Sequence, residues 1–193
     1  MKVILATKSP YRKEIFSYLG VPFDVAGSNV DESQIERGKP EDLVESLSKL
    51  KAEAVAVNHQ DAITIGMDSV ACFEGKIFEK PKSKEEEFQR LKDLSGRRFQ
   101  FYTGIHMINA SSGKILSRVV KTEVFMRNIS EAEINKYLSE DPFFNTYALG
   151  YDPVKHSSAS FIQRIEGSYY NLLGGIPVEA VIEMLGDIGY KEG

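Results

Sequence analysis

The sequence predicts a mixed α/β protein in which a twisted sheet is flanked by helices. Short apolar runs typical of buried strands alternate with segments whose apolar residues recur at helical spacing. Two long segments, residues 98–109 and 114–127, are separated by a Ser-Ser-Gly turn and predict a pair of antiparallel strands. Strands that first alternate with helices and then pair along the chain indicate a mixed sheet. The 193 residues contain no linker and no repeat, so one larger domain or two small ones are possible.

The N-terminal segment predicts a strand, a helix and a second strand. Residues 3–6 form a short apolar run. Ser9 is a candidate N-cap, and Pro10 suits the first helical position because its missing N–H would have no partner there. Apolar residues then recur at helical spacing until Gly20, which is expected to end the helix. The second strand is expected near residues 23–26.

A polar loop over residues 27–38 precedes a long helix, which is expected from Pro40 to Val57. One apolar stripe along this helix predicts the face that packs on the sheet. The predicted stripe consists of Leu43, Leu47, Leu50, Ala54 and Val57.

The middle of the chain predicts a strand over residues 62–67 and a tight hairpin over residues 70–78. A helix follows, because Ser83 and Glu86 have the spacing of a capping box and Gly96 is suited to a C-terminal stop.

The C-terminal part predicts fewer elements. Ser130 and Glu133 form a second predicted capping box, which begins a short helix. Residues 161–165 are expected to form a strand, and residues 177–185 a final helix. Residues 141–160 show no clear pattern.

The composition is that of a globular protein with a substantial core. Apolar residues make up 42% of the chain and charged residues 27%. The net charge of −4 argues against general binding of nucleic acid, and no apolar run is long enough to span a membrane. A lone cysteine, Cys72, fits a reducing cytoplasm, which is the expected location, and is predicted to lie in the core.

The start of the first helix is a candidate phosphate site. Free N–H groups at a helix N-terminus attract anions, and Ser9, Arg12 and Lys13 lie there. Cations in a first turn oppose the helix dipole, so two of them suggest a concentrated positive potential. The alternative is an ordinary capping serine beside two solvated cations.

Lys51 and Asp68 are the next candidates. Lys51 falls inside the apolar arc of the long helix, where a lysine either extends to solvent or reaches into a pocket. Asp68 follows the apolar strand 62–67, at the carboxyl end where α/β sheets place ligand sites. The alternative is a turn aspartate that bonds its own backbone.

Glu32 and Lys80 complete the set as charged loop residues. Together the cations offer donors to phosphates, while Glu32 and Asp68 offer carboxylates as base or metal ligands. That mixture suits hydrolysis of a polyphosphate with a divalent cation. The three histidines have no partner at zinc spacing.

These residues lie within short motifs that resemble the Maf (septum-formation inhibitor) family. LATKSPYRKE from Leu5 is similar to the family's Leu-Ala-Ser-x-Ser-Pro-Arg-Arg-x-Glu, and GMDSV from Gly66 is similar to its Ala-Asp-Thr-Val. Further matches follow in the family's order, up to IEGSYYN from Ile165. The remaining matches are residues 30–32, 50–52, 79–81, 94–97 and 102–104.

The resemblance implies a nucleoside triphosphate pyrophosphatase that releases a monophosphate and pyrophosphate. It implies one domain over residues 1–193, with two lobes around a central cleft and a fold shared with inosine-triphosphate pyrophosphatases. It implies dependence on Mg²⁺ or Mn²⁺, pyrimidine or modified nucleotides as substrates, and a homodimer, while the lack of a long apolar run predicts no membrane partner. By carry-over, Asp68 is the proton acceptor or a metal ligand, and Glu32 assists the metal. The residues implied to hold phosphates are Ser9, Arg12, Lys13, Lys51 and Lys80.

Three departures from the family bear on the substrate. Tyr11 replaces the first arginine of the pair, and Ser69 stands where threonine is usual, beside the expected base. Lys155 aligns with a glutamine, and an ammonium only donates hydrogen bonds. We therefore expect Lys155 to favour bases rich in carbonyls, unless it is a solvated surface cation.

Two other functions remain as alternatives. The opening Ala6-Thr7-Lys8-Ser9 loosely resembles that of inosine/xanthosine-triphosphate pyrophosphatases, although Ser9 and the later motifs disfavour them. The other alternative is a nucleotide-binding regulator of cell division without catalysis.

Overall fold

The computed structural model describes residues 1–191, and the chain forms two compact units. The first unit contains residues 1–69 and 102–120 and the C-terminal segment from Tyr170. The second unit contains residues 70–101 and 121–169.

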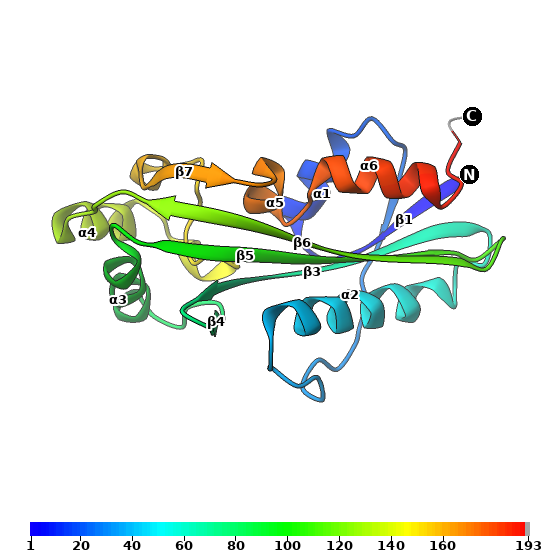
Figure 1. Cartoon of the computed structure of the whole chain (residues 1–193), viewed down its shortest axis with the longest axis horizontal. Coiled ribbons are helices and arrows are strands. Elements are labelled where there is room, and N and C mark those ends of the chain that lie inside the picture. The colour runs from blue at the N-terminus through cyan, green and yellow to red at the C-terminus, as the bar shows by residue number, and fades with distance from the viewer. Residues whose placement is uncertain (192–193) are drawn as a thin grey trace. The chain divides into compact units, whose positions relative to one another are not determined.

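A mixed sheet of seven strands confirms the predicted fold class (Figure 1). The strand order is β2-β1-β3-β5-β6-β7, with β4 paired to β3. Strand β1 is parallel to both β2 and β3, whereas β4 is antiparallel to β3 and β7 to β6. The strands are β1 (Lys2–Ala6), β2 (Asp24–Ala26), β3 (Ala62–Phe73), β4 (Lys76–Phe78), β5 (Arg98–Asn109), β6 (Lys114–Met126) and β7 (Ile162–Glu166).

The helices are close to the predicted ones. They are α1 (Pro10–Ser17), α2 (Pro40–Ala56), α3 (Lys84–Leu94), α4 (Glu131–Glu140), α5 (Tyr169–Gly174) and α6 (Val178–Asp187). Helix α5 was not predicted, and the unassigned residues 141–160 contain two short 3₁₀ helices, Phe144–Thr146 and Ser157–Ser160.

The N-terminal caps test the predictions in detail. Ser9 caps α1, and the reciprocal capping box of Ser130 and Glu133 is present at α4. Of the two hydrogen bonds in the capping box predicted at α3, one is present and the other is wrong. Ser83 accepts from the Glu86 N–H, but the Glu86 carboxylate accepts from the backbone of Lys82 instead of that of Ser83.

Strand β3 is longer than predicted and places the polar pair Asp68-Ser69 inside the sheet. Residues 62–67 and 70–73 were predicted as two elements, but they form one strand of 12 residues. The apolar pattern breaks at Asp68 and Ser69 because these side chains have polar partners on the two faces of the sheet. The prediction of Asp68 at a strand end or in a turn is therefore wrong.

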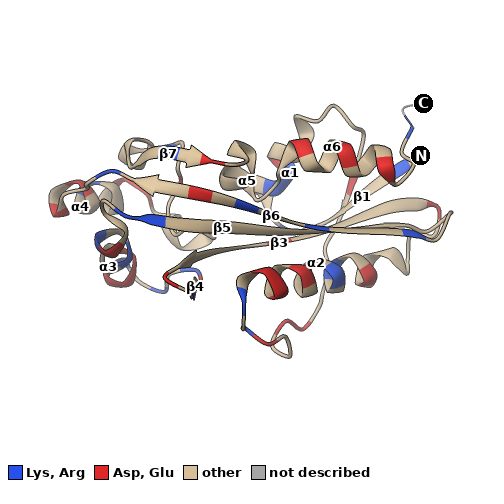
Figure 2. Cartoon of the chain, in the orientation of Figure 1, with Lys and Arg blue, Asp and Glu red and all other residues tan. Residues whose placement is uncertain are grey.

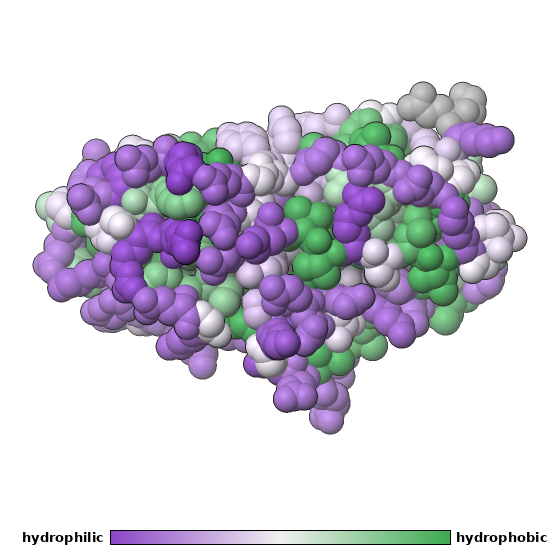
Figure 3. Space-filling view, viewed as in Figure 1, coloured by the Kyte–Doolittle hydropathy of each residue, from purple (hydrophilic) through white to green (hydrophobic). Residues whose placement is uncertain are grey.

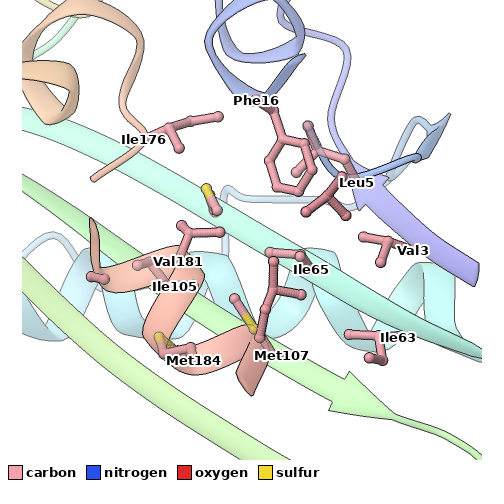
Figure 4. Close-up of a cluster of buried hydrophobic side chains, with 14 of the residues drawn as sticks. Val3, Leu5, Phe16, Ile63, Ile65, Ile105, Met107, Ile176, Val181 and Met184 are labelled. Carbon is pink, nitrogen blue, oxygen red and sulfur yellow. The ribbon is translucent and has the colours of Figure 1, made fainter. Parts of the chain in front are cut away.

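Successive side chains of β3 point to opposite faces of the sheet, so the core of the first unit lies on both faces. Ile63, Ile65 and Met67 pack with Phe16 of α1 and Val181 of α6 (Figure 4). Helix α2 lies on the opposite face of these strands (Figure 1). Each fully buried side chain of this size contributes about 1.5–3 kcal/mol of burial free energy.

Helix α2 packs on the sheet through a face that is rotated from the predicted stripe. Leu43 and Leu47 are buried as predicted, but Ala54 and Val57 are exposed. The other buried positions are Val44, Ser48, Ala52, Val55 and Ala56. The rotation follows from β3 and β5, where Gly66 and Gly104 meet the α2 backbone directly. A Cβ at Gly66 would lie 2.2 Å from the Ser48 carbonyl oxygen, and one at Gly104 would lie 2.1 Å from that of Val44.

The surface carries mixed charge and scattered apolar residues. Lys and Arg are interspersed with Asp and Glu (Figure 2), and hydrophilic residues predominate on the face shown in Figure 3. Within the described residues, no helix is long and apolar enough to cross a bilayer. Cys72 is buried, as predicted.

The core of the second unit contains a buried carboxyl group, that of Glu87 on α3. Its side chain is fully buried, and neither oxygen has a hydrogen-bond partner among the described residues. The Nε atom of Arg90 lies 3.6 Å from one of these oxygens, and a Cβ at Gly150 would lie 2.2 Å from it. Burial raises the pKa of Glu87 to about 8, although the charge of Arg90 opposes the shift.

We expect Glu87→Gln to stabilise the protein at alkaline pH. The folded state retains the Glu87 proton up to a pKa of about 8, whereas the ordinary pKa is 4.5. Wild-type stability should therefore fall as pH rises through this window, by about 1.4 kcal/mol per pH unit. Thermal unfolding at pH 5, 7 and 8.5 should show the gain of Glu87→Gln growing with pH.

The matched control for this experiment is Glu85→Gln, which changes an exposed carboxylate on the same helix. Hydrogen bonds lower the pKa of Glu85, so its ionised form favours the folded state, and the variant should gain nothing as pH rises. Parallel pH curves for wild type and Glu87→Gln would show that Glu87 is ionised without penalty.

Candidate active site

Asp68 lies on β3 just beyond the end of its neighbouring strand. Strand β1 ends at Ala6, which pairs with Gly66. Residue 68 is therefore past the last β1 residue, where the chain of β1 turns away into α1. The open position that is usually found at a strand end is created here by the shorter neighbour.

Lys51 reaches this position from α2 and bridges two carboxylates. Its Nζ atom lies 2.5 Å from Oδ1 of Asp68 and 2.9 Å from Oε1 of Glu32. The side chains of Lys51 and Asp68 are each only 14% exposed, while that of Glu32 is 40% exposed. Of the two orientations considered for Lys51, the structure has the one that points away from bulk solvent and toward the carboxylates.

Arg12 forms hydrogen bonds to β3 at the residues before and after Asp68. Its Nη1 atom donates to the carbonyl oxygen of Met67 at 3.0 Å, and Nη2 donates to Oγ of Ser69 at 3.1 Å. Burial lowers the pKa of Arg12, and the negative charges of Asp68 and Glu32 oppose this shift. The Nε–H is buried and has no partner among the described residues, so one donor of this guanidinium is unused by the protein.

Ser69 connects Arg12 to a residue that the sequence did not single out, Thr103 of β5. The two hydroxyl oxygens lie 2.7 Å apart, and Thr103 is fully buried. The signal for Thr103 was its place in residues 102–104, one of the matches to the Maf family. Gly175 lies against the same group, because a Cβ there would be 2.4 Å from Oγ of Ser69.

Ser9 is the N-cap of α1, and Lys13 lies in the first turn of this helix. The Ser9 hydroxyl accepts from the Arg12 N–H at 3.3 Å, so this N–H is engaged as a cap, and Pro10 has none to offer. Lys13 is exposed and lines a hollow of about 560 Å³ together with Phe23 and Val25. Their contact with phosphate stays a prediction.

Lys80 and Lys155 belong to the second unit and are exposed there. Lys155 lies 4.0 Å from Asp152, and its side chain is 65% exposed. The roles predicted for both lysines stay predictions, as does the cleft implied by the resemblance.

The charges that meet around Asp68 balance each other. Lys51 and Arg12 supply two positive charges, and Asp68 and Glu32 supply two negative ones. A carboxylate held in this way can accept a proton from water. The site can therefore supply a base beside two cations.

The sequence and the fold are similar to those of known proteins. Residues 2–188 match the family described as Maf-like protein. The chain belongs to the Maf-like family. A dTTP/UTP pyrophosphatase of Syntrophus aciditrophicus is 39% identical over 189 residues, which are 97% of this chain and 90% of that protein. A 7-methyl-GTP pyrophosphatase of Nitrosococcus oceani is 34% identical over 194 residues, covering 97% of this Maf-like chain and 94% of that protein.

Solved structures of two Ham1 proteins share the fold of this Maf-like chain. The protein from Staphylococcus aureus has a TM-score of 0.56 at 17% identity, with 97% of this chain and 98% of that chain covered. The protein from Coxiella burnetii has a TM-score of 0.53 at 13% identity, with 97% and 99% covered. The likeness concerns the fold alone.

Gly66→Ala should destabilise the protein, because the added methyl group meets the α2 backbone that carries Lys51. A Cβ at this position lies 2.6 Å from the Ala52 nitrogen, as well as close to Ser48. We expect a loss of about 1–3 kcal/mol in the free energy of unfolding, measured by urea denaturation.

Gly38→Ala is the matched control, because Gly38 precedes the same helix and a Cβ there has open space around it. Its stability should stay within about 0.5 kcal/mol of wild type. Equal stability of both variants would mean that α2 does not pack directly on Gly66.

Proposed function

We propose that the chain hydrolyses nucleoside triphosphates to nucleoside monophosphate and pyrophosphate. The observation that carries this proposal is the site around Asp68, where a carboxylate is held by Lys51 and Arg12 bonds to the residues on either side of it. The names of the Maf-like relatives, dTTP/UTP pyrophosphatase and 7-methyl-GTP pyrophosphatase, support the same reaction.

In the proposed reaction Asp68 accepts a proton from the attacking water. The water oxygen bonds to the α-phosphorus, the bond from that phosphorus to the α,β-bridging oxygen breaks, and its electron pair leaves with pyrophosphate. Lys51 holds Asp68 in place, and we propose that the positive charge of Arg12 attracts an anionic oxygen of the phosphates. Ser9, Lys13 and Lys80 are proposed as further phosphate ligands.

The carboxylates fit a divalent cation such as Mg²⁺ or Mn²⁺, which we propose as the cofactor. Asp68 and Glu32 both bind Lys51, through one oxygen each. Their donor chemistry suits a hard cation that is typically held by one or two carboxylates together with substrate phosphates. When bound, such a cation would neutralise charge on the phosphates.

The names of the relatives support two candidate substrate classes. We propose pyrimidine nucleotides such as dTTP and UTP first, because several relatives at 35–39% identity carry that name. The 7-methyl-GTP pyrophosphatase of Nitrosococcus oceani is a relative at 34% identity and supports a modified guanine nucleotide as the second candidate. Lys155 remains our proposed contact for carbonyl groups of the base.

A nucleotide panel tests the proposed function. Incubation with dTTP, UTP, CTP, GTP and 7-methyl-GTP in the presence of Mg²⁺ or Mn²⁺ should yield monophosphate and pyrophosphate, resolved by ion-exchange chromatography. Diphosphate and orthophosphate as first products would contradict attack at the α-phosphorus. Tight binding without any turnover would favour a nucleotide-binding regulator instead.

Asp68→Asn should abolish most of the activity while preserving the fold. The amide keeps the shape and can still accept from Lys51, but it cannot take a proton from water. We expect turnover to fall by roughly 10²–10⁴ at saturating metal.

The matched control is Asp61→Asn, which changes an exposed carboxylate that precedes the same strand. It should retain wild-type turnover and melting temperature. Near-parental turnover of Asp68→Asn would show that Asp68 is not the base.

A further inference from the structure

The Ser69 hydroxyl is the meeting point of two hydrogen-bonding groups on one face of β3. Arg12 donates to its oxygen through Nη2 at 3.1 Å, and Thr103 lies 2.7 Å away. A hydroxyl oxygen has two acceptor positions and one proton to donate. What Ser69 can offer to a ligand therefore depends on which way the bond to Thr103 runs.

The burial of Thr103 decides the direction of this bond. Thr103 is fully buried, and Ser69 is the only side-chain partner that its hydroxyl has among the described residues. If Ser69 donated to Thr103, the Thr103 proton would be buried without an acceptor, which is costly. Thr103 therefore donates to Ser69, and Ser69 accepts from both Thr103 and Arg12.

With both acceptor positions filled, the Ser69 proton must point elsewhere. Ser69 is partly exposed, and Gly175 closes one side, since a Cβ there would lie 2.4 Å from the Ser69 oxygen. The hydroxyl can then only donate to an incoming group. This makes it selective for an acceptor oxygen and leaves it unable to accept.

We infer that Thr103 is a positioning residue of this site, which fixes the Ser69 hydroxyl as a hydrogen-bond donor to an acceptor oxygen of the bound nucleotide. Thr103 acts through Ser69 and does not touch the nucleotide. The inference rests on the proposed function for its substrate, but the hydrogen-bond arrangement is independent of turnover.

A double-mutant cycle tests the inference. Thr103→Val removes the donor at nearly constant volume, and Ser69→Ala removes the group that it positions. Each single variant should lower kcat/KM by about 10-fold, the value of roughly one hydrogen bond. In the Ser69→Ala background, Thr103→Val should cause no further loss, because its effect passes through the missing hydroxyl.

The controls separate positioning from simple packing. Thr103→Ser keeps the donor and should retain kcat/KM within about 3-fold. Thr64→Val changes another buried threonine of the same sheet, whose hydroxyl has no partner among the described residues, and should leave kinetics unchanged. If Thr103→Val fails to fold, the same cycle with Thr103→Ala replaces it. Losses that multiply in the double variant, or an unchanged Thr103→Val, would overturn the inference.

Calorimetric binding of a non-hydrolysable α,β-methylene nucleoside triphosphate distinguishes this failure from that of the proposed function. If the wild type binds the analogue but releases no pyrophosphate from any nucleotide, the proposed function fails. The same cycle measured on Kd should still be non-additive. If turnover is present and the cycle is additive, only the role of Thr103 is wrong.

Discussion

The contact between the backbones of α2 and β3 is the constraint on which the site depends. At Gly66 the strand has no side chain, so the helix carbonyl of Ser48 and the amide of Ala52 approach where a Cβ would otherwise lie. At this separation the Nζ atom of Lys51 reaches to 2.5 Å from Oδ1 of Asp68. Gly104 provides the same close approach one strand further along the sheet. The absence of a Cβ at Gly66 and Gly104 thus lets α2 lie close to the sheet, and this places the ammonium group of Lys51.

The site also shows how partly buried charges are compensated by partners. Isolated charges of this kind would be expensive to remove from water. Lys51 contacts two carboxylates, and the Arg12 guanidinium is used in two hydrogen bonds to β3. Glu87 in the second unit avoids a buried charge in another way. Burial raises its pKa to about 8, so the carboxyl group keeps its proton near neutral pH. The site surrounds its buried charges with opposite charges, whereas protonation makes the buried carboxyl of Glu87 neutral.

Local signals in the sequence predicted much of the fold and part of the site. The caps at Ser9 and Ser130 depend on residues within one turn, so spacing alone identifies them. Lys51 was located by helical periodicity, although the buried face of α2 is rotated because Gly66 and Gly104 act from other strands. Thr103 could not be assigned a role, since it acts across 34 positions of sequence through Ser69. The sequence places Asp68 at the end of a strand, because the partners of a polar pair within a buried strand are distant residues that the sequence pattern does not show.

Successive side chains of β3 point to opposite faces of the sheet, and this alternation limits which mutations the site can tolerate. Met67 and Ser69 face α1, whereas Asp68 between them faces α2. Loss or gain of a single codon upstream in this strand would exchange the two faces. The carboxylate would then turn toward the Arg12 side and the serine toward Lys51, although every residue of the site would still be encoded. Insertions and deletions in β3 should therefore be excluded more strictly than most substitutions, and variation in length should be confined to the loops that precede and follow it.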